Sequence, residues 1–379
     1  MDDRADLIDL VTPGSVVALG DGVGAPTSVH EELSRAARAA GGVTLVLGWV
    51  MTPIDQLDLT SFSRVVALMG GYSLRGPIDQ GLVEYLPVRL GTTPSLLREQ
   101  LRPDLLIASG SRRRGEMRFT TEISWQRGAI AAGARVAVIE RPGNACADGG
   151  PALPDNSVDV GVCDALAFEQ RWPGPSDVDR MIAARVASLV CKGDRLQCPP
   201  GPLGTAVLDA LGVAVVLDGG ILTDASADLW RRDLVIGEPV ATYIIGTSDL
   251  YDWADGRDVL SGVEHTHHPG RLVTGARLVA VNTALEIDID GQVNVERAGG
   301  SAVAGIGGQP DFAAAGAAGG VNIIAVPTSR RGRPTLVDRL EGPVTTPSHD
   351  VGIIVTERGM ADLRGLDRNA RRRAIETLW

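Results

Sequence analysis

Short apolar runs that alternate with helix-like segments constrain the fold of this chain more than any other feature. In the first half, glycine or polar residues bound each run, as is typical of buried strands, and the runs lie at 16–19, 43–47, 65–68, 105–108 and 136–139. Helical patterns fall between several of them, notably at 29–40 and 123–132. This alternation predicts an α/β domain with a largely parallel sheet.

A second series of the same kind follows a break in the pattern. Pro173-Gly174-Pro175-Ser176 precedes an amphipathic helix at 178–190, with Ser176 or Asp177 as its cap. We therefore predict one domain over residues 1–175 and another over 176–379. The apolar runs of the second domain lie at 213–217, 240–245, 278–281, 321–325 and 352–356, and the Ala/Gly-rich tract at 313–320 predicts a closely packed helix end and turn.

The two halves share a weak internal repeat. A turn and a strand precede Gly20-Asp21-Gly22-Val23-Gly24 in the first half, and Gly193-Asp194-Arg195-Leu196-Gln197 precedes Pro199-Pro200-Gly201 in the second. The repeat predicts two similar domains that face each other across a cleft. The loop at 22–26 suits an anion, although a single glycine loop is weak evidence for one.

Composition excludes several classes of function. With 379 residues, of which 44% are hydrophobic, the chain can bury two cores. The net charge of −11 argues against nucleic acid as the main partner. The four cysteines have no CxxC spacing, the first residues do not resemble a leader, and no apolar stretch is long enough to span a bilayer. We expect a soluble, cytoplasmic protein that binds neither nucleic acid nor membrane.

The tract from Asn282 to Gly365 contains the most specific sequence motifs in the chain. In order, these are Asn282-Thr283-Ala284-Leu285-Glu286, Gly305-Ile306-Gly307-Gly308-Gln309, Thr345-Thr346-Pro347 and Glu357-Arg358-Gly359-Met360. They resemble the C-terminal domain of the acetyl-CoA hydrolase/transferase family, which includes 4-hydroxybutyrate and acetate CoA-transferases. Weaker matches, such as Gly22–Pro26 and Gly193-Asp194, extend the resemblance over nearly the whole chain.

The resemblance implies a fold, a set of ligands and a mechanism. It implies two similar CoA-transferase-like α/β domains, coenzyme A as substrate or product, an acyl-CoA and a small carboxylic acid as partners, a homo-oligomer and no metal. In the family, a glutamate attacks the thioester and then carries CoA as a thioester of its own, while backbone N–H groups stabilise the oxyanion. The CoA contacts that it implies here are Gly201, Asn282, Gly305, Gly308 and Gln309.

Two departures from the family pattern change the expected chemistry. The segment Leu217-Asp218-Gly219-Gly220-Ile221-Leu222-Thr223-Asp224 matches the family's nucleophile segment, and alignment on Thr223-Asp224 puts Gly220 at the position of the catalytic glutamate. Pro200 and Pro202 also remove two backbone donors from the loop at 198–204. The usual nucleophile is therefore absent from its expected position, and Gly201 is the best remaining donor.

Asp218 and Glu357 are the candidate catalytic carboxylates that remain. Asp218 is either a shorter nucleophile that a shifted alignment would permit or an ordinary turn residue beside Gly219 and Gly220. Glu357 follows the strand predicted at 352–356, where α/β sheets place ligand-binding groups. The resemblance implies an acid/base or water-positioning role for it, and a structural ion pair is the alternative.

Other polar clusters have simpler alternatives. The residues Glu264, His265, His267 and His268 suggest two metal ligands on one face of a strand, but Pro269-Gly270 favours an exposed loop. Similarly, Arg112-Arg113-Arg114 suits CoA phosphates or forms a solvated basic turn. Glu286 fits a strand with one wet face.

The sequence leaves two functions open. The chain is either an enzyme of acyl-CoA metabolism with altered chemistry, binding its ligand in the interdomain cleft, or a non-catalytic CoA-binding or partner subunit. In the second case a separate subunit would supply the missing carboxylate.

Overall fold

The computed structural model describes residues 5–379. Contacts between residues divide the chain into two compact units, of which the first contains the described residues up to Gln170 together with Thr242–His265. The second contains Arg171–Ala241 and Thr266–Trp379. The domain boundary at 175/176 remains a prediction from the sequence.

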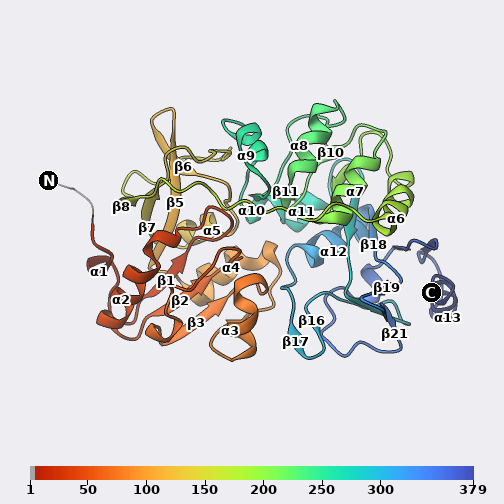
Figure 1. Ribbon diagram of the computed structural model, residues 1–379, viewed down its shortest axis with the longest axis horizontal. Coiled ribbons are helices and arrows are strands. Elements are labelled where there is room, and N and C mark those ends of the chain that lie inside the picture. Colours follow the sequence, from red (N-terminus) through yellow and green to blue (C-terminus); the bar gives the residue numbers. More distant parts are fainter. Residues whose placement is uncertain (1–4) are drawn as a thin grey trace. The chain divides into compact units, whose positions relative to one another are not determined.

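The first unit is built on a sheet with the strand order β4-β3-β2-β1-β5-β7-β8, and β6 pairs with β5 (Figure 1). All pairs in this order are parallel, and only the β5–β6 hairpin is antiparallel. The strands are β1 (Val16–Leu19), β2 (Thr44–Leu47), β3 (Arg64–Ala67), β4 (Glu84–Tyr85), β5 (Leu105–Arg113), β6 (Glu116–Phe119), β7 (Arg135–Glu140) and β8 (Val158–Val162).

Helices of the first unit lie between these strands or follow them. They are α1 (Leu7–Leu10), α2 (His30–Ala40), α3 (Arg75–Asp79), α4 (Thr93–Leu96), α5 (Gln126–Ala131) and α9 (Ser248–Ala254). The short strand β12 (Tyr243–Ile244) also belongs to this unit, and α10 (Val263–Thr266) lies where the chain passes to the second unit. The strand predicted at 240–245, in the series of the second domain, is therefore shorter and belongs to the first unit.

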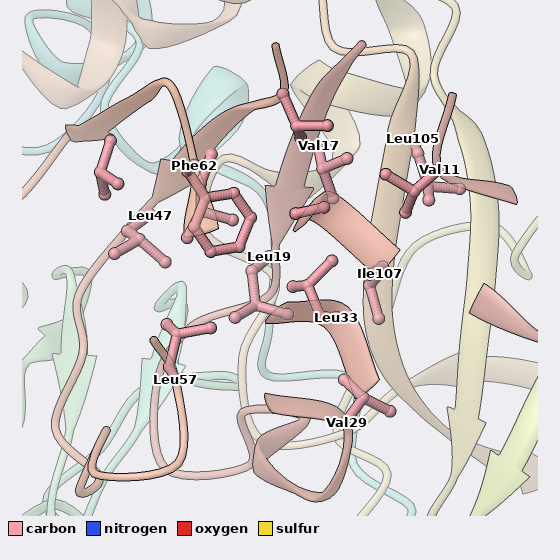
Figure 2. Close-up of a cluster of buried hydrophobic side chains, with 14 of the residues drawn as sticks. Val11, Val17, Leu19, Val29, Leu33, Leu47, Leu57, Phe62, Leu105 and Ile107 are labelled. Carbon is pink, nitrogen blue, oxygen red and sulfur yellow. The ribbon is translucent and has the colours of Figure 1, made fainter. Parts of the chain in front are cut away.

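The core of the first unit forms where α2 packs on one face of the sheet (Figure 2). Leu33, Ala36 and Ala37 of α2 recur at helical spacing and are buried. They meet side chains that alternate along the strands, such as Val17 and Leu19. The intervening residues of these strands are buried as well, as expected for a parallel sheet that is covered on both faces.

The second unit is built on a similar sheet, with the order β10-β9-β13-β18-β22-β23. Its pairs are parallel except for the final β22–β23 pair. The strands are β9 (Arg195–Gln197), β10 (Val216–Leu217), β13 (Leu278–Asn282), β18 (Val321–Ala325), β22 (Ile353–Val355) and β23 (Met360–Asp362). Two α/β units with largely parallel sheets were predicted, and this fold class is confirmed.

Helices and short strands complete the second unit. The helices are α6 (Asp177–Ser188), α7 (Pro202–Ala210), α8 (Asp224–Arg231), α11 (Pro269–Leu272), α12 (Gln309–Gly319) and α13 (Arg368–Glu376). The short strands are β11 (Ile221–Leu222), β14 (Glu286–Asp288), β15 (Val293–Asn294), β16 (Arg297–Ala298), β17 (Ser301–Ala302), β19 (Ser329–Arg330), β20 (Arg333–Pro334) and β21 (Leu336–Val337).

Local sequence signals account for how two of these helices begin and end. Ser176, one of the two predicted caps, begins α6 in a reciprocal capping box with Asp179. Helix α12 ends at Gly319, and a Cβ on Gly316 would lie 2.9 Å from the carbonyl oxygen of Val321. The closely packed helix end predicted at 313–320 is therefore confirmed.

Replacing Leu33 by alanine should destabilise the first unit. Its side chain is fully buried between α2 and the sheet, so the change leaves a cavity worth about 3 kcal/mol of unfolding free energy. Urea denaturation followed by tryptophan fluorescence would measure it. The matched control is Leu82→Ala, because Leu82 is 45% exposed and its truncation should cost less than about 0.5 kcal/mol. Equal losses for the two variants would contradict this account of the core.

Candidate functional site

The strand order of the second unit makes one edge of its sheet a candidate ligand site. The chain passes from β9 to β10 on one side and returns to β13 on the other side of β9. Such a reversal opens a crevice at the carboxyl ends of the two central strands. The segments that begin at this edge are the loop after β9, the turn after β10 and the end of β13. They contain Gly201, Asp218, Gly220 and Asn282.

Asn282 is the last residue of β13 and is buried. Its Nδ2 donates to Oδ1 of Asn322 at 3.0 Å, and Nδ2 of Asn322 donates to the carbonyl oxygen of Asp350 at 2.7 Å. This chain of amides fixes Asn282 at the edge of the sheet.

Gly201 begins helix α7 in a conformation that glycine alone adopts readily, with φ 95° and ψ −170°. Pro202 occupies the first helical position, where a missing N–H costs little. Leu203 and Gly204 follow it, and the first N–H groups of a helix have no intrahelical acceptor. The first turn of α7 thus supplies backbone N–H donors, although Pro200 and Pro202 themselves have none.

The Gly305–Gln309 loop leads into α12. Gly307 has φ 57°, and Gly308 is the residue before the helix. At the first helical position, Nε2 of Gln309 donates to Oγ1 of Thr346 at 3.0 Å. Gln309 thus links the start of α12 to Thr345-Thr346, another of the motifs on which the resemblance rests.

His267 lies between the nucleophile segment and this glycine loop. Its side chain is buried, with Nδ1 2.8 Å from Oγ1 of Thr266 and its ring edge-on to Phe312 at 5.0 Å. A Cβ on Gly220 would lie 3.4 Å from Nε2 of His267, and a Cβ on Gly308 would lie 2.5 Å from it. The position of the expected glutamate and a predicted CoA-binding glycine therefore meet at one imidazole.

The interpretation of the histidine cluster as an exposed loop is wrong for His267. The segment forms α10 and α11, and Thr266 and His267 turn inward while His265 and His268 are exposed. Burial lowers the pKa of His267 to about 3, and the charge of Arg271 acts in the same direction. The ring is therefore neutral. The sequence contained only one weak signal for the burial of His267. This signal is the neighbouring Thr266, which is its hydrogen-bond partner in the structure.

Asp218 is buried and held by two arginines. Arg271 reaches both carboxylate oxygens at 2.7 and 2.8 Å, and Nε of Arg195 donates to Oδ2 at 2.9 Å. Burial acts to raise the pKa of Asp218, but the hydrogen bonds and charges of Arg271 and Arg195 outweigh it and hold the pKa below its ordinary value. This arrangement favours an ion pair over a nucleophile at Asp218.

Glu357 follows β22 and is half-buried. Its carboxylate accepts a hydrogen bond from the backbone N–H of Thr328 at 2.9 Å and another from the hydroxyl of Thr328. Burial raises its pKa, and the bonds from Thr328 more than offset this, so the pKa lies below its ordinary value. Glu357 thus remains ionised and fixed by the β18–β19 connection.

The other polar candidates have structural partners. Oε2 of Glu286 accepts from Nδ2 of Asn294 on the paired strand at 3.2 Å. Arg112 and Arg113 pair with Glu140 at 3.1 Å and Asp258 at 2.7 Å, at the end of the β5–β6 hairpin. This hairpin end borders a cavity of about 450 Å³ in the first unit.

The glycine loop of the first unit encloses a carboxyl group of the chain itself, that of Glu122. Oε2 of Glu122 accepts from the N–H of Gly24 at 3.0 Å and from Oγ1 of Thr121 at 2.7 Å. A Cβ on Gly22 or Gly24 would lie 2.5 or 2.6 Å from the Glu122 carboxylate oxygens. The glycines are therefore needed for the close approach of this carboxyl group.

Asp21, in the same loop, is a second buried carboxyl that the sequence did not single out as functional. Its Oδ2 accepts from the N–H of Trp49 at 2.8 Å, Nε1 of Trp125 at 2.9 Å and the hydroxyl of Tyr243 at 2.8 Å. Burial raises the pKa of Asp21 to about 6 and that of Glu122 to about 7. Tyr243 lies far away in sequence, so no local pattern predicts this cluster.

Within residues 5–379, no group of three or more His, Cys, Asp or Glu side chains is arranged to hold a metal ion. In the same part of the chain, no helix has the length and apolar character needed to cross a membrane.

Comparison with known proteins supports the predicted resemblance. Residues 246–377 match the acetyl-CoA hydrolase/transferase C-terminal domain. The chain is 27% identical over 341 residues to 4-hydroxybutyrate coenzyme A transferase from Clostridium kluyveri, covering 82% of this chain and 77% of the relative. It is also 27% identical over 406 residues to succinyl-CoA:cyclohexane-1-carboxylate CoA transferase from Geobacter metallireducens, covering 99% of this chain and 92% of the relative.

The resemblance to the acetyl-CoA hydrolase/transferase family that the sequence motifs predicted is confirmed by these matches. The crystal structure of RipA from Yersinia pestis has the same fold, with a TM-score of 0.85, 23% identity and coverage of 98% of this chain and 92% of that chain. The relatives are named CoA transferases and an acetyl-CoA hydrolase, and these matches support a function of the CoA-transferase or acetyl-CoA hydrolase type for this chain.

Replacing Asp218 by asparagine should strongly destabilise the second unit. The change leaves Arg195 and Arg271 facing each other without a carboxylate, which costs on the order of 3–5 kcal/mol for a buried pair. Thermal and urea denaturation would measure the loss. Asp228→Asn is the matched control, because it removes an exposed ion pair with Arg231 and should cost less than about 1 kcal/mol. An Asp218→Asn protein as stable as the wild type would contradict the structural role.

The buried carboxyls should make the stability of the first unit depend on pH. Their pKa values are higher in the folded than in the unfolded state, so their stabilisation is fully present below about pH 4 and is lost as pH rises through about 6 to 7. The loss is on the order of 3 kcal/mol for each carboxyl.

Urea denaturation at several pH values between 5 and 8 would test this dependence. Asp21→Asn and Glu122→Gln should each flatten the decline in stability over this range. Glu31→Gln, on the exposed side of α2, keeps both buried carboxyls and should keep the slope. A wild-type protein whose first unit gains stability between pH 5 and 8, by an amount that both variants leave unchanged, would contradict the assignment.

Proposed function

We propose that this chain binds an acyl-CoA at the β9/β13 edge of its second unit and acts on the thioester without the family's usual glutamate. The observation that carries the proposal is the meeting of Gly220 and Gly308 at His267. One glycine aligns with the nucleophile position and the other belongs to the predicted CoA loop. No carboxylate side chain can extend from position 220.

The CoA contacts that we propose are Gly201, Asn282, Gly305, Gly308 and Gln309. Support comes from the strand order, because Gly201 follows β9 and Asn282 ends β13, the two strands that flank the reversal. Gly308 and Gln309 start α12, whose first N–H groups favour an anionic or carbonyl oxygen. Glycine at these positions lets a ligand approach the backbone.

We assign different roles to the two candidate carboxylates. Asp218 acts as the structural partner of Arg195 and Arg271, since a carboxylate bound to two arginines is a poor nucleophile. Glu357 keeps a role in holding a water or an acid near the site, as an ionised group at the end of β22. Its hydrogen bonds to Thr328 fix its orientation.

The relatives' names guide the choice of substrates. 4-Hydroxybutyrate and succinyl-CoA:cyclohexane-1-carboxylate CoA transferases act on CoA and carboxylic acids, and we propose an acyl-CoA and a small carboxylic acid for this chain. Coenzyme A serves as substrate or product and no metal takes part. A cytoplasmic homo-oligomer and a ligand-binding interdomain cleft remain predictions from the sequence.

The second candidate is a CoA-binding subunit without chemistry of its own. It is favoured by glycine at position 220 and by the ion pairs of Asp218, which together leave the nucleophile segment without a free carboxylate. A partner subunit would then supply the reacting group.

One experiment separates these possibilities. The protein is incubated with acetyl-CoA and with longer acyl-CoAs, and binding, released thiol and protein mass are measured. Binding with thiol release supports the enzyme, and binding without release supports the subunit. Failure to bind any CoA species would overturn both.

Restoring the glutamate should restore a covalent intermediate. A side chain at position 220 meets Nε2 of His267 and Phe312 at 3.4 to 3.9 Å from its Cβ, so we combine Gly220→Glu with His267→Ala to make room. After incubation with acetyl-CoA, we expect intact-protein mass spectrometry to detect a CoA adduct on this double variant and none on the wild type.

A matched control separates the effect of the carboxylate from the effect of side-chain volume. Gly220→Gln with His267→Ala has nearly the same volume but no carboxylate, and it should form no adduct. A CoA adduct on the wild-type protein that maps to Asp218 would contradict the role assigned to that residue.

A further inference from the structure

Nε2 of His267 is a buried polar atom without a hydrogen-bond partner among residues 5–379. The side chain is only 1% exposed, and an unmade hydrogen bond at such a place costs about 1–3 kcal/mol. Native proteins retain few such groups, and those that persist often serve a ligand or a reaction. This atom lies where the positions of the missing glutamate and of the predicted CoA loop come together.

The surroundings of the ring keep it neutral and fix its direction. Nδ1 is bonded to Oγ1 of Thr266, and Phe312 packs against the ring. Arg271 opposes a second positive charge nearby. When the hydroxyl of Thr266 donates to Nδ1, Nε2 carries the proton of the neutral imidazole and is a hydrogen-bond donor.

Glycine backbone and the edge of an aromatic ring lie close to Nε2 of His267. A Cβ on Gly308 would lie 2.5 Å from Nε2 of His267 and 3.2 Å from Cε2 of Phe312. The loop at Gly305–Gly308 contains three glycines, which resist rearrangement less than other residues do. A shift of this loop is required for an oxygen atom of a ligand to reach Nε2, because Gly308 lies close to it.

We propose that Nε2 of His267 donates a hydrogen bond to the thioester carbonyl oxygen of a bound acyl-CoA, an inference that rests on the proposed function. The carbonyl oxygen is an acceptor that free CoA lacks, so His267 makes the site selective for the acylated form. A neutral imidazole donor in a dry site also stabilises negative charge that develops on this oxygen. It compensates for the backbone donors that Pro200 and Pro202 remove.

The test compares two stable analogues, one with a carbonyl group at the position of the thioester carbonyl and one without it. One is a ketone analogue of acetyl-CoA in which CH₂ replaces sulfur, and the other is S-ethyl-CoA, which has no carbonyl. Isothermal titration calorimetry measures both dissociation constants. We expect the wild type to bind the ketone about 3- to 10-fold more tightly than the thioether, as one hydrogen bond provides.

Substitution of His267 should abolish this preference. His267→Ala should bring the ratio of the two constants to about 1 and leave the affinity for S-ethyl-CoA unchanged. His267→Gln keeps an N–H donor and should retain part of the preference for the ketone. His349→Ala is the matched control, because His349 lies in the same unit with a 79% exposed side chain. A ratio that His267→Ala leaves unchanged would overturn the proposal.

A second measurement covers the case in which the variants do not fold. In the wild-type protein labelled with ¹⁵N-histidine, the ketone should shift the Nε2 resonance of one buried histidine, whereas S-ethyl-CoA should not. Equal spectra with both ligands would overturn the proposal. If neither analogue binds the wild type, the proposed function itself fails, and the two failures are thereby distinguished.

Discussion

The ion pairs of Asp218 with Arg195 and Arg271 hold together the parts of the second unit on which its candidate site depends. Arg195 comes from β9, Asp218 follows β10, and Arg271 lies in α11. Arg271 also donates to the carbonyl oxygen of Thr266 at 3.1 Å, next to His267. The turn that carries Gly220 and the segment that carries His267 are thus joined through one carboxylate.

This cluster has an electrostatic consequence for the imidazole. Two guanidinium groups share one carboxylate, and further carbonyl oxygens complete the environment of Arg195, whose Nη1 donates to Leu272 and Thr274 at 3.2 and 2.6 Å. Carbonyl groups near the end of a helix carry partial negative charge and suit a cation. The excess positive charge disfavours protonation of His267, which burial already disfavours. Arg271, which binds Asp218 and the carbonyl oxygen of Thr266, therefore also helps to keep the imidazole neutral, whereas the charge of Asp218 acts in the opposite direction.

Regular elements could be predicted from the sequence because their causes are local. The strand at 16–19 and the cap at Ser176 follow from apolar runs and from short-range hydrogen bonding. The burial of His267 could not be predicted in this way, because the sequence around Pro269-Gly270 is also typical of an exposed turn. Its environment comes from Gly220 and Phe312, which are distant in the chain, and the cluster of Asp21 with Tyr243 has the same origin.

The two glycine loops of the internal repeat differ in the groups that lie against their backbone. After β1, the N–H of Gly24 is bonded to the carboxylate of Glu122, which fills the space beside Gly22 and Gly24. This loop therefore binds a carboxyl group within its own unit, and the suggestion that it binds an external anion loses its main support. After β9, a Cβ on Gly201 would meet Trp172 only at 3.7 Å or more, and no carboxylate lies as close as Glu122 does in the first loop. The same topology thus yields an internally satisfied loop in one unit and, in the other, an edge at which a buried imidazole still has an unused hydrogen bond. This difference is the physical reason to seek the ligand chemistry in the second unit.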